Sequence, residues 1–589
     1  MKRKQPLYEF VRVIKTGCTL SWRSSPRCMI LRILCKIINP INTLILSFLG
    51  KKIIDNISYN NKEVLYTIII LLIMLTGIRI INCMINAFAE YAQEMHNISI
   101  ERKLSLDLLE QAISLDIEIY DNPEYHDKLN MAKYNLNSVF NITWNFITAI
   151  SSVISLCGSF IILAQTNIIY GVLILITSIP SALTNKRYIK IFYNLNKSQI
   201  QMERKKNYLF YVGTSREYAQ DIRFFQIDSF IKEKYLKLDD HVYKSKKDII
   251  KNKNFNLILA NILPEIIFAI ITIDITKNIL FHKGTVGDYS LYTGVISQVW
   301  GSVMMLISAF ARIYDDKLRV ESIEQFFSLQ PSIQDNGVEE LVEVSSIRFN
   351  NVTFIYPGSE QLILDNLNLE LLGGKKYLLV GINGSGKTTL IKLLLRFYEV
   401  TKGTIEINGR DIRAYSLKSL RKAFMVYFQN MMNYSFTLRD NVVLSDINKT
   451  INNGEIIRLL IECGCEDILK MAHQGLNSYI SRLFETTGVE LSGGQSQKIA
   501  LTRTFYRDAP IVILDEPSSA LDPLAEKELF EMFEQFWENK LVLFTSHQMR
   551  HVAFADEIIV LEHGRVIEKG DKEDLMNQKG RFAQMNWKL

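Results

Sequence analysis

The sequence is poor in cysteine, glycine and proline. Among 589 residues there are 7 Cys, 28 Gly and 11 Pro, and no Cys-x-x-Cys pair or Cys/His spacing of a metal site occurs. These shortages exclude a disulfide-stapled scaffold, a collagen-like chain and a low-complexity disordered chain. The basic N-terminus is not followed by the short apolar core and small-residue cleavage site of a signal peptide. We therefore interpret the cysteines as reduced packing residues.

A large excess of charge of one sign is also lacking. The net charge of +6 does not indicate a nucleic-acid partner, and we expect none. With 48% hydrophobic and 22% charged residues, the chain is too apolar for an ordinary soluble enzyme and too charged for a pure membrane carrier. This average predicts a mixture of a lipid-embedded part and a water-soluble part.

Long apolar stretches occur only in the first half of the chain. A helix needs about 20 apolar residues to cross about 30 Å of hydrocarbon, and most of six stretches reach that length. We therefore expect a six-span helical transmembrane domain over residues 1–330 and a soluble α/β nucleotide-binding domain over residues 346–589. The expected spans are residues 28–50, 64–88, 138–163, 168–183, 255–280 and 289–310.

Lys and Arg are concentrated before the first span and in residues 184–253, which predicts that both termini and the two long loops face the cytoplasm. The long loops, residues 89–137 and 184–253, have room for helical extensions of the spans with a short helix at each tip. The apolar–polar pattern of residues 208–225 suits one such amphipathic tip. The lipid bilayer of the cytoplasmic membrane is thus an expected partner.

A phosphate-binding loop follows a predicted buried strand, Tyr377–Val380. It has the spacing GxxxxGK[ST] and precedes a helical pattern, which is the context that supports this motif. Glycines let backbone N–H groups converge on phosphate, the lysine reaches the β- and γ-phosphates, and the first threonine hydroxyl can bind Mg²⁺. The expected nucleotide-binding residues here are Gly381, Asn383, Gly384, Ser385, Gly386, Lys387, Thr388 and Thr389.

A second buried strand, Ile511–Leu514, runs directly into two acids. Parallel strands end at one edge of a sheet, so these acids should meet the phosphate loop. Asp515 would hold Mg²⁺, and Glu516 would act as the general base toward the attacking water. The alternative is an ordinary strand end with two solvated acids.

The string Leu491-Ser492-Gly493-Gly494-Gln495, together with these features, resembles the signature of the ATP-binding-cassette family. The resemblance covers nearly the whole chain. It implies that Ser492, Gly493, Gly494 and Gln495 bind the γ-phosphate of ATP held by a second cassette. One molecule cannot then close either site, which implies a homodimer.

Other family elements match one at a time. The resemblance implies that Tyr356 stacks on adenine, that Gln429 contacts Mg²⁺ and relays to the membrane domain, and that His547 senses the γ-phosphate. Residues 519–522 match the loop that crosses the dimer interface. Tyr356 could instead be a strand-edge aromatic, and a lone histidine after a strand is usually structural.

One cassette behind six spans resembles the exporter branch, and more finely the lanthipeptide and bacteriocin type of peptide exporter. Residues 119–125, 214–219 and 496–500 carry the finer match. We expect ATP-driven peptide export by alternating access, without leader cleavage, since about 27 residues precede the first span. A lipid or multidrug exporter and an ATP-gated channel remain alternatives. Three ionisable residues, Arg79, Glu265 and Asp274, fall in or near spans; they are candidates for lining a cargo cavity, and helix-end or paired structural roles are the alternative.

Overall fold

The computed structural model describes residues 6–58, 64–165, 167–281, 284–429, 431–517, 523–546 and 548–586. The chain divides into two compact units. Unit 1 comprises residues 1–114 and 123–330, and unit 2 comprises residues 115–122 and 331–589. Unit 2 is therefore built from two separate pieces of the chain.

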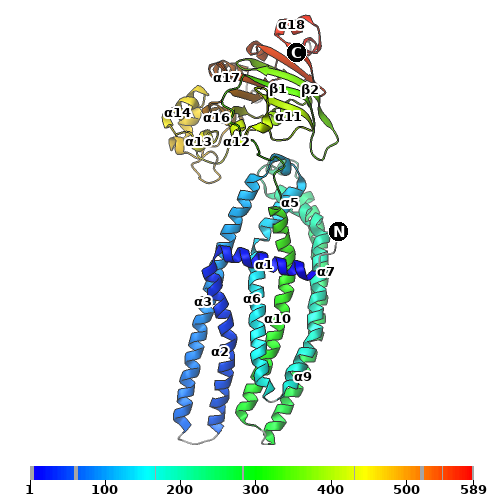
Figure 1. Cartoon of the computed structure of the whole chain (residues 1–589), viewed down its shortest axis with the longest axis vertical. Helices are drawn as coiled ribbons and strands as arrows, with labels where there is room; N and C mark the ends of the chain where they lie inside the picture. The colour runs from blue at the N-terminus through cyan, green and yellow to red at the C-terminus, as the bar shows by residue number, and fades with distance from the viewer. Residues whose placement is uncertain are drawn as a thin grey trace. The chain divides into compact units, whose positions relative to one another are not determined.

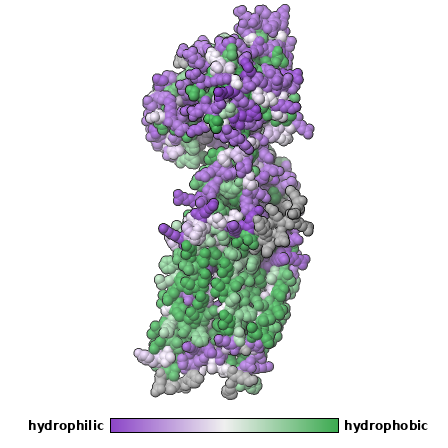
Figure 2. Space-filling view, viewed as in Figure 1, coloured by the Kyte–Doolittle hydropathy of each residue, from purple (hydrophilic) through white to green (hydrophobic). Residues whose placement is uncertain are grey.

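Unit 1 is entirely helical (Figure 1). Six of its helices among the described residues are long and apolar enough to cross a membrane. Hydrophobic residues gather as a broad zone over these helices (Figure 2), which confirms the predicted fold class for this half. The helices are α1 (Pro6–Ser24), α2 (Pro26–Ser58), α3 (Leu65–Ser114), α5 (Pro123–Tyr134), α6 (Leu136–Ala164), α7 (Ile168–Thr214), α8 (Ala219–Phe224), α9 (Asp228–Leu280) and α10 (Val286–Phe327).

Prolines lie inside three of the long helices. Pro40 lies in α2, Pro180 in α7 and Pro264 in α9, and each helix continues beyond its proline. In hydrocarbon an interrupted helix would leave backbone groups without water to bind them, so a locally adjusted helix costs less than an ended one. The apolar stretch that we ended at residue 183 is thus only the first part of a 47-residue helix.

The long loops are helical extensions, as the sequence predicts. Helix α3 has 50 residues, so it is about 75 Å long at 1.5 Å per residue. The second predicted tip is shorter than residues 208–225. Residues 208–214 instead complete α7, which ends where Ser215 adopts an extended backbone, and α8 occupies only Ala219–Phe224.

Most of the basic segment before the first expected span forms helix α1. The Ser21 hydroxyl lies 2.8 Å from the Thr143 hydroxyl of α6, and the His96 ring of α3 donates to the Ser21 carbonyl at 3.0 Å. Arg12 forms an ion pair with Glu324 of α10 at 2.7 Å. These contacts attach α1 to α3, α6 and α10 of unit 1.

The described residues of unit 2 form two sheets. The first is antiparallel, in the order β2 (Leu362–Leu372), β1 (Ser346–Ile355), β4 (Lys402–Ile407) and β5 (Arg410–Asp411). The second has the order β10 (Arg565–Gly570), β9 (Glu557–Glu562), β3 (Lys376–Val380), β8 (Leu541–Thr545), β7 (Ile511–Asp515) and β6 (Phe424–Tyr427). Its strands are parallel except for the edge strand β10. All residues of β7 and β8 are buried, as expected for central parallel strands.

Helices pack around the second sheet (Figure 1), which confirms the predicted α/β class. They are α11 (Lys387–Leu394), α12 (Leu417–Lys422), α13 (Leu438–Val443), α14 (Asn453–Glu462), α15 (Glu466–Met471), α16 (Gly493–Tyr506), α17 (Pro523–Phe536), α18 (Lys572–Asn577) and α19 (Arg581–Asn586).

The strand register brings three chain segments to one edge of the sheet. Thr545, the last residue of β8, pairs with Leu379 of β3 on one side and with Asp515 of β7 on the other. The loop after β3 and the acids after β7 therefore lie on either side of Thr545.

Candidate nucleotide site

The loop of residues 381–388 turns sharply between β3 and α11. Gly384 has a φ of +79° and Gly386 a φ of +106°, a left-handed region that favours glycine. A Cβ atom at Gly386 would lie 2.7 Å from Leu364 Cδ2, so a larger residue would also clash. A tight glycine turn of this kind lets backbone N–H groups approach a phosphate at the start of a helix.

Two polar groups of this loop suit a phosphate ligand. Lys387 is 7% exposed, and its ammonium donates to the Gly381 carbonyl at 2.9 Å. Burial lowers its pKa, and the carboxylates of Glu516 and Asp515 oppose that shift. The buried Ser385 hydroxyl has no hydrogen-bond partner among the described residues. A phosphate would give the Ser385 hydroxyl the acceptor that it lacks and would give Lys387 a charged acceptor.

Asp515 lies at the end of β7 and is 2% exposed. Its two carboxylate oxygens accept hydrogen bonds from the hydroxyls of Thr388, at 3.0 Å, and Thr545, at 2.8 Å. Burial raises the pKa of Asp515, and these hydrogen bonds oppose the shift. A carboxylate beside a threonine hydroxyl is a donor set that fits Mg²⁺.

Glu516 is held in a strained backbone conformation. Its φ is +51°, which is uncommon for a residue with a side chain. Its N–H donates to the Thr545 hydroxyl at 2.9 Å, and its carboxylate accepts from the Gln429 amide at 2.6 Å. The structure thus joins Thr388, Asp515, Glu516 and Gln429 into one chain of contacts, with Thr545 at its centre.

Tyr356 lies beside the loop, at the end of β1. Its hydroxyl forms a 3.0 Å hydrogen bond with that of Thr389. Its ring meets the Tyr398 ring edge to face with centroids 5.2 Å apart, and the Lys392 ammonium lies 5.8 Å from both centroids. Tyr356 is therefore attached to the site, and its expected role toward adenine stays a prediction.

The signature residues do not join this network. Ser492 caps the N-terminus of α16, its hydroxyl accepting from the Gln495 N–H while the Gln495 side chain accepts from the Ser492 N–H. The side chain of Gln495 also donates to Asp467 at 2.6 Å. Ser492 and Gly493 are exposed. None of the hydrogen bonds found in the described ranges links residues 492–495 to the phosphate loop.

Two predicted elements, His547 and residues 519–522, lie outside the described residues. The residues on either side of position 547 are anchored. The Ser546 hydroxyl accepts from the Gln548 N–H at 3.0 Å and lies 2.6 Å from the His551 Nδ1. The other ring nitrogen of His551 lies 2.9 Å from the buried Glu526 carboxylate.

Sequence reasoning did not assign roles to Thr545, His551 or Glu526. The position of Thr545 directly after four apolar strand residues was an available signal, since that is where parallel strands carry polar site residues. No comparable signal marks Glu526 and His551, because they meet only through the packing of α17 against the sheet.

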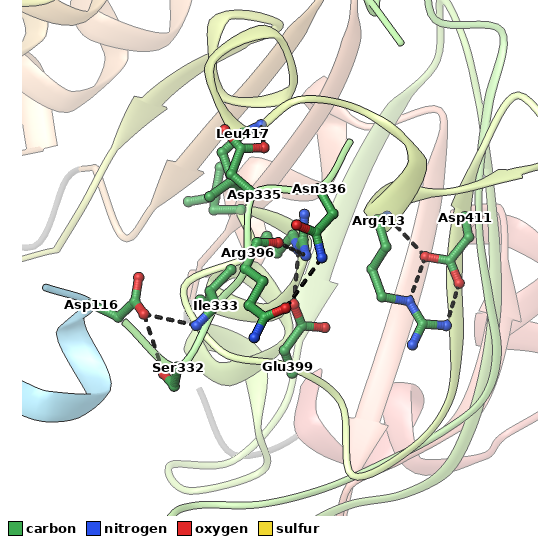
Figure 3. A network of polar contacts seen from close by, with 12 residues as sticks. Asp116, Ser332, Ile333, Asp335, Asn336, Arg396, Glu399, Asp411, Arg413 and Leu417 are labelled. Atoms are coloured by element: carbon green, nitrogen blue, oxygen red, sulfur yellow. Dashed lines mark hydrogen bonds and ion pairs between the residues drawn. The ribbon is translucent and has the colours of Figure 1, made fainter. Parts of the chain in front are cut away.

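Residues 115–122, here called the tip segment, belong to unit 2 and contain the short helix α4 (Ile117–Tyr120). The Asp116 carboxylate accepts from the Ile333 N–H at 2.8 Å and from the Ser332 hydroxyl at 3.2 Å (Figure 3). At the other end of the segment, the Tyr398 hydroxyl donates to Asp121. Tyr398 thus contacts both the tip segment and Tyr356.

The linker after Ser332 is tied into the same unit (Figure 3). Asp335 accepts from the N–H of Leu417 at 2.9 Å, and the Arg396 guanidinium, after the phosphate-loop helix, donates to the Gln334 carbonyl at 3.1 Å. Arg396 also pairs with Glu399 at 2.9 Å. The tip segment therefore contacts a linker that is itself held to unit 2 by hydrogen bonds.

A phosphate loop after β3, the acids Asp515 and Glu516 at the end of β7 in the same sheet, and six candidate spans define an ATPase that is coupled to membrane transport. Comparison with known families agrees: residues 364–519 match the ABC transporter family, and residues 28–303 match the ABC transporter transmembrane region. The chain belongs to the ABC transporter family and is a multi-pass membrane protein.

Two relatives and one solved structure show the similarity in more detail. The chain is 28% identical over 559 residues to the Subtilin transport ATP-binding protein SpaT of Bacillus subtilis, which covers 93% of this chain and 90% of the relative. It is 33% identical over 304 residues to an ATP-dependent lipid A-core flippase of Methylobacillus flagellatus, covering 51% of each. A solved bacterial Atm1-family ABC exporter with ATP bound shares the fold, with a TM-score of 0.81 and 20% identity over 96% of this chain and 98% of that one.

Proposed function

We propose that the protein is a homodimeric exporter that moves a peptide across the cytoplasmic membrane, using ATP hydrolysis to alternate between inward-open and outward-open states. The observation that carries the proposal is the similarity over 93% of the chain to a subtilin transport protein. The concentration of Lys and Arg before the first span and in residues 184–253 supports a cytoplasmic location for unit 2 and both termini.

The exposed signature supports the homodimer. Ser492 and Gly493 are open to solvent, and the described residues connect neither of them to the phosphate loop of their own chain. A second copy would bring its signature to this loop, and the N-terminus of the 14-residue helix α16 would then face the terminal phosphate. Each dimer would hold two complete sites.

Within a site, each side chain has a task. Lys387 and the loop amides bind phosphate, Glu516 accepts a proton from the attacking water, and Gln429 orients the Glu516 carboxylate through its 2.6 Å hydrogen bond. His547 would contact the γ-phosphate. Thr388, Asp515 and Gln429 would hold Mg²⁺, which, when bound, supplies positive charge to neutralise the phosphate oxygens.

The test is transport by the full chain reconstituted in liposomes. We expect a hydrophobic probe peptide to accumulate inside inside-out vesicles against its gradient when ATP is present, and not with a non-hydrolysable ATP analogue. Leakage of the peptide down its gradient with either nucleotide would instead indicate an ATP-gated channel.

A lipid exporter is the second candidate, because the similarity to the lipid A-core flippase covers half of the chain. A fluorescent lipid assay on the same vesicles separates the two candidates. ATP-dependent flipping of the lipid without peptide accumulation would contradict the peptide proposal.

A further inference from the structure

The three ionisable residues singled out in the spans differ in their surroundings. The Asp274 carboxylate accepts a 2.5 Å hydrogen bond from the hydroxyl of Tyr170, a residue that is 9% exposed. Asp274 therefore has a structural partner between α9 and α7. Glu265, nine residues earlier on α9, has no hydrogen bond or ion pair with any described residue, and it lines a cavity within unit 1.

This cavity has a volume of about 110 Å³ and lies among three spanning helices. Since a water molecule takes about 30 Å³ of liquid, the cavity holds only a few heavy atoms. Sites for drug-sized ligands are about 300–1,000 Å³, so the cavity suits the end of one side chain rather than a whole ligand. Its lining is Ile174 of α7, Pro264, Glu265 and Phe268 of α9, and Ser297 and Trp300 of α10.

Glu265 is exposed rather than buried, and it lies deep in the expected span. It lies 15 residues from the Leu280 end of α9, and Trp300 lies 14 residues from the adjoining Val286 end of α10. At 1.5 Å per residue both are about 21–23 Å from the same side, within a hydrocarbon layer of about 30 Å. A carboxylate at this depth needs an opposite charge or water.

The surrounding groups indicate which charge the cavity accepts. Trp300 and Phe268 contribute aromatic rings, a type of group whose face attracts cations, and Ser297 contributes a hydroxyl oxygen that can accept a hydrogen bond. A carboxylate, two aromatic rings and a hydroxyl together favour an ammonium or guanidinium group and repel phosphate or carboxylate.

We propose that Glu265, Trp300, Phe268 and Ser297 form a subsite that binds a positively charged side chain, lysine or arginine, of the exported peptide. The inference rests on the proposed peptide transport and adds a charge requirement to it. The peptide carries its cation into the span as far as Glu265, where this carboxylate neutralises it.

The test uses a pair of synthetic hydrophobic peptides that differ at one position, lysine in one and norleucine in the other. Binding of each labelled peptide is measured by fluorescence anisotropy to the full chain in lipid nanodiscs without ATP. A hydrogen bond to a charged partner is worth about tenfold or more in affinity, so we expect the lysine peptide to bind at least about tenfold more tightly.

Glu265→Gln should abolish this preference while leaving the affinity for the norleucine peptide within about twofold, since the amide keeps the size of the side chain but removes its charge. Glu265→Asp should retain part of the preference. Asp274→Asn is the matched control on the same helix and should keep the full preference. An undiminished lysine preference in Glu265→Gln, or an equal loss in Asp274→Asn, would overturn the subsite.

Folding and transport are read out separately. Each variant must keep its basal ATP hydrolysis and its melting temperature. Should Glu265→Gln fail to assemble, Trp300→Leu provides the second variant, and a preference unchanged in it would overturn the subsite. Because binding is measured without ATP, charge-selective binding without peptide accumulation in vesicles would contradict the proposed function and leave the subsite intact.

Discussion

Thr545 shows how much of the site depends on one buried hydroxyl. It donates to Asp515 at 2.8 Å and accepts from the Glu516 N–H at 2.9 Å, so it fixes both acids. Thr545→Val keeps the shape and removes both contacts. We expect ATP hydrolysis to fall about tenfold or more, and stability to fall by about 1–3 kcal/mol because a buried carboxylate loses a donor. Steady-state ATPase rates and thermal melting test this.

The control for this substitution is Thr504→Val. Thr504 is also buried, and its hydroxyl bonds the Ala500 carbonyl within α16 at 3.0 Å, away from the acids. Similar ATPase losses in the two variants would contradict a specific role for Thr545.

Glu516 is the residue on which hydrolysis should depend most. Glu516→Gln preserves the contact with Gln429 in size but cannot accept a proton, so we expect ATP to bind normally and the hydrolysis rate to fall about 10²–10⁴-fold. Binding of a fluorescent ATP analogue and single-turnover hydrolysis separate the two effects. Glu534→Gln, an exposed acid on α17, is the control. Near-normal turnover in Glu516→Gln would refute the general-base assignment.

At this scale the phosphate loop and the two acids were predictable from sequence, because each follows a short apolar strand directly. The strand register then brings them together. The bond between Gln429 and Glu516 joins residues 87 positions apart, and only the family resemblance placed Gln429 in the site. Thr545 was predictable in place but not in its two contacts, since these depend on side-chain rotamers.

Among the elements, the tip segment offers a physical route between the spans and the nucleotide. It directly follows α3 in the chain, and Tyr398 links its Asp121 to the Tyr356 ring. Tyr398→Phe keeps the ring contact and removes the hydroxyl. We expect the stimulation of ATP hydrolysis by transported peptide to fall several-fold, because a coupling free energy is typically about 1–3 kcal/mol.

The measurement is the ratio of peptide-stimulated to basal ATPase rate. Asp411→Asn is the control, because Asp411 pairs only locally with Arg413, among the described residues, and does not touch the tip segment (Figure 3). An unchanged stimulation ratio in Tyr398→Phe would exclude this hydroxyl from coupling.

The elements themselves were unequally predictable. Apolar length located the long helices, and the length of the two long loops predicted their helical extensions, whereas α1 depends on packing. Helix α1 was missed because only part of its length is apolar and its contacts, such as Ser21 with Thr143, join residues 122 positions apart.

For the whole molecule, shared sites in a homodimer predict complementation between two inactive variants. Lys387→Ala removes the phosphate lysine, and Ser492→Arg blocks the signature. Each homodimer would then hold two defective sites, whereas a mixed dimer would hold one intact site, formed by Lys387 of one copy and Ser492 of the other.

We expect each variant alone to be nearly inactive and co-expressed variants to regain ATP hydrolysis when mixed dimers are purified through two different tags. Lys387→Ala mixed with differently tagged Lys387→Ala is the control and should stay inactive. No regain in the mixed dimer would contradict sites shared between copies.

The split composition of unit 2 has a consequence for recombination. Residues 115–122 belong to unit 2, although they lie between two segments of unit 1 in the sequence. Their hydrogen-bond partners Ser332, Ile333 and Tyr398 all belong to the C-terminal piece of unit 2. A chimaera that exchanges only the C-terminal part with a relative would therefore pair a foreign cassette with a resident tip. Chimaeras that exchange residues 115–122 together with residues 331–589 should be functional more often. The segment that recombination has to keep together is therefore discontinuous in the chain.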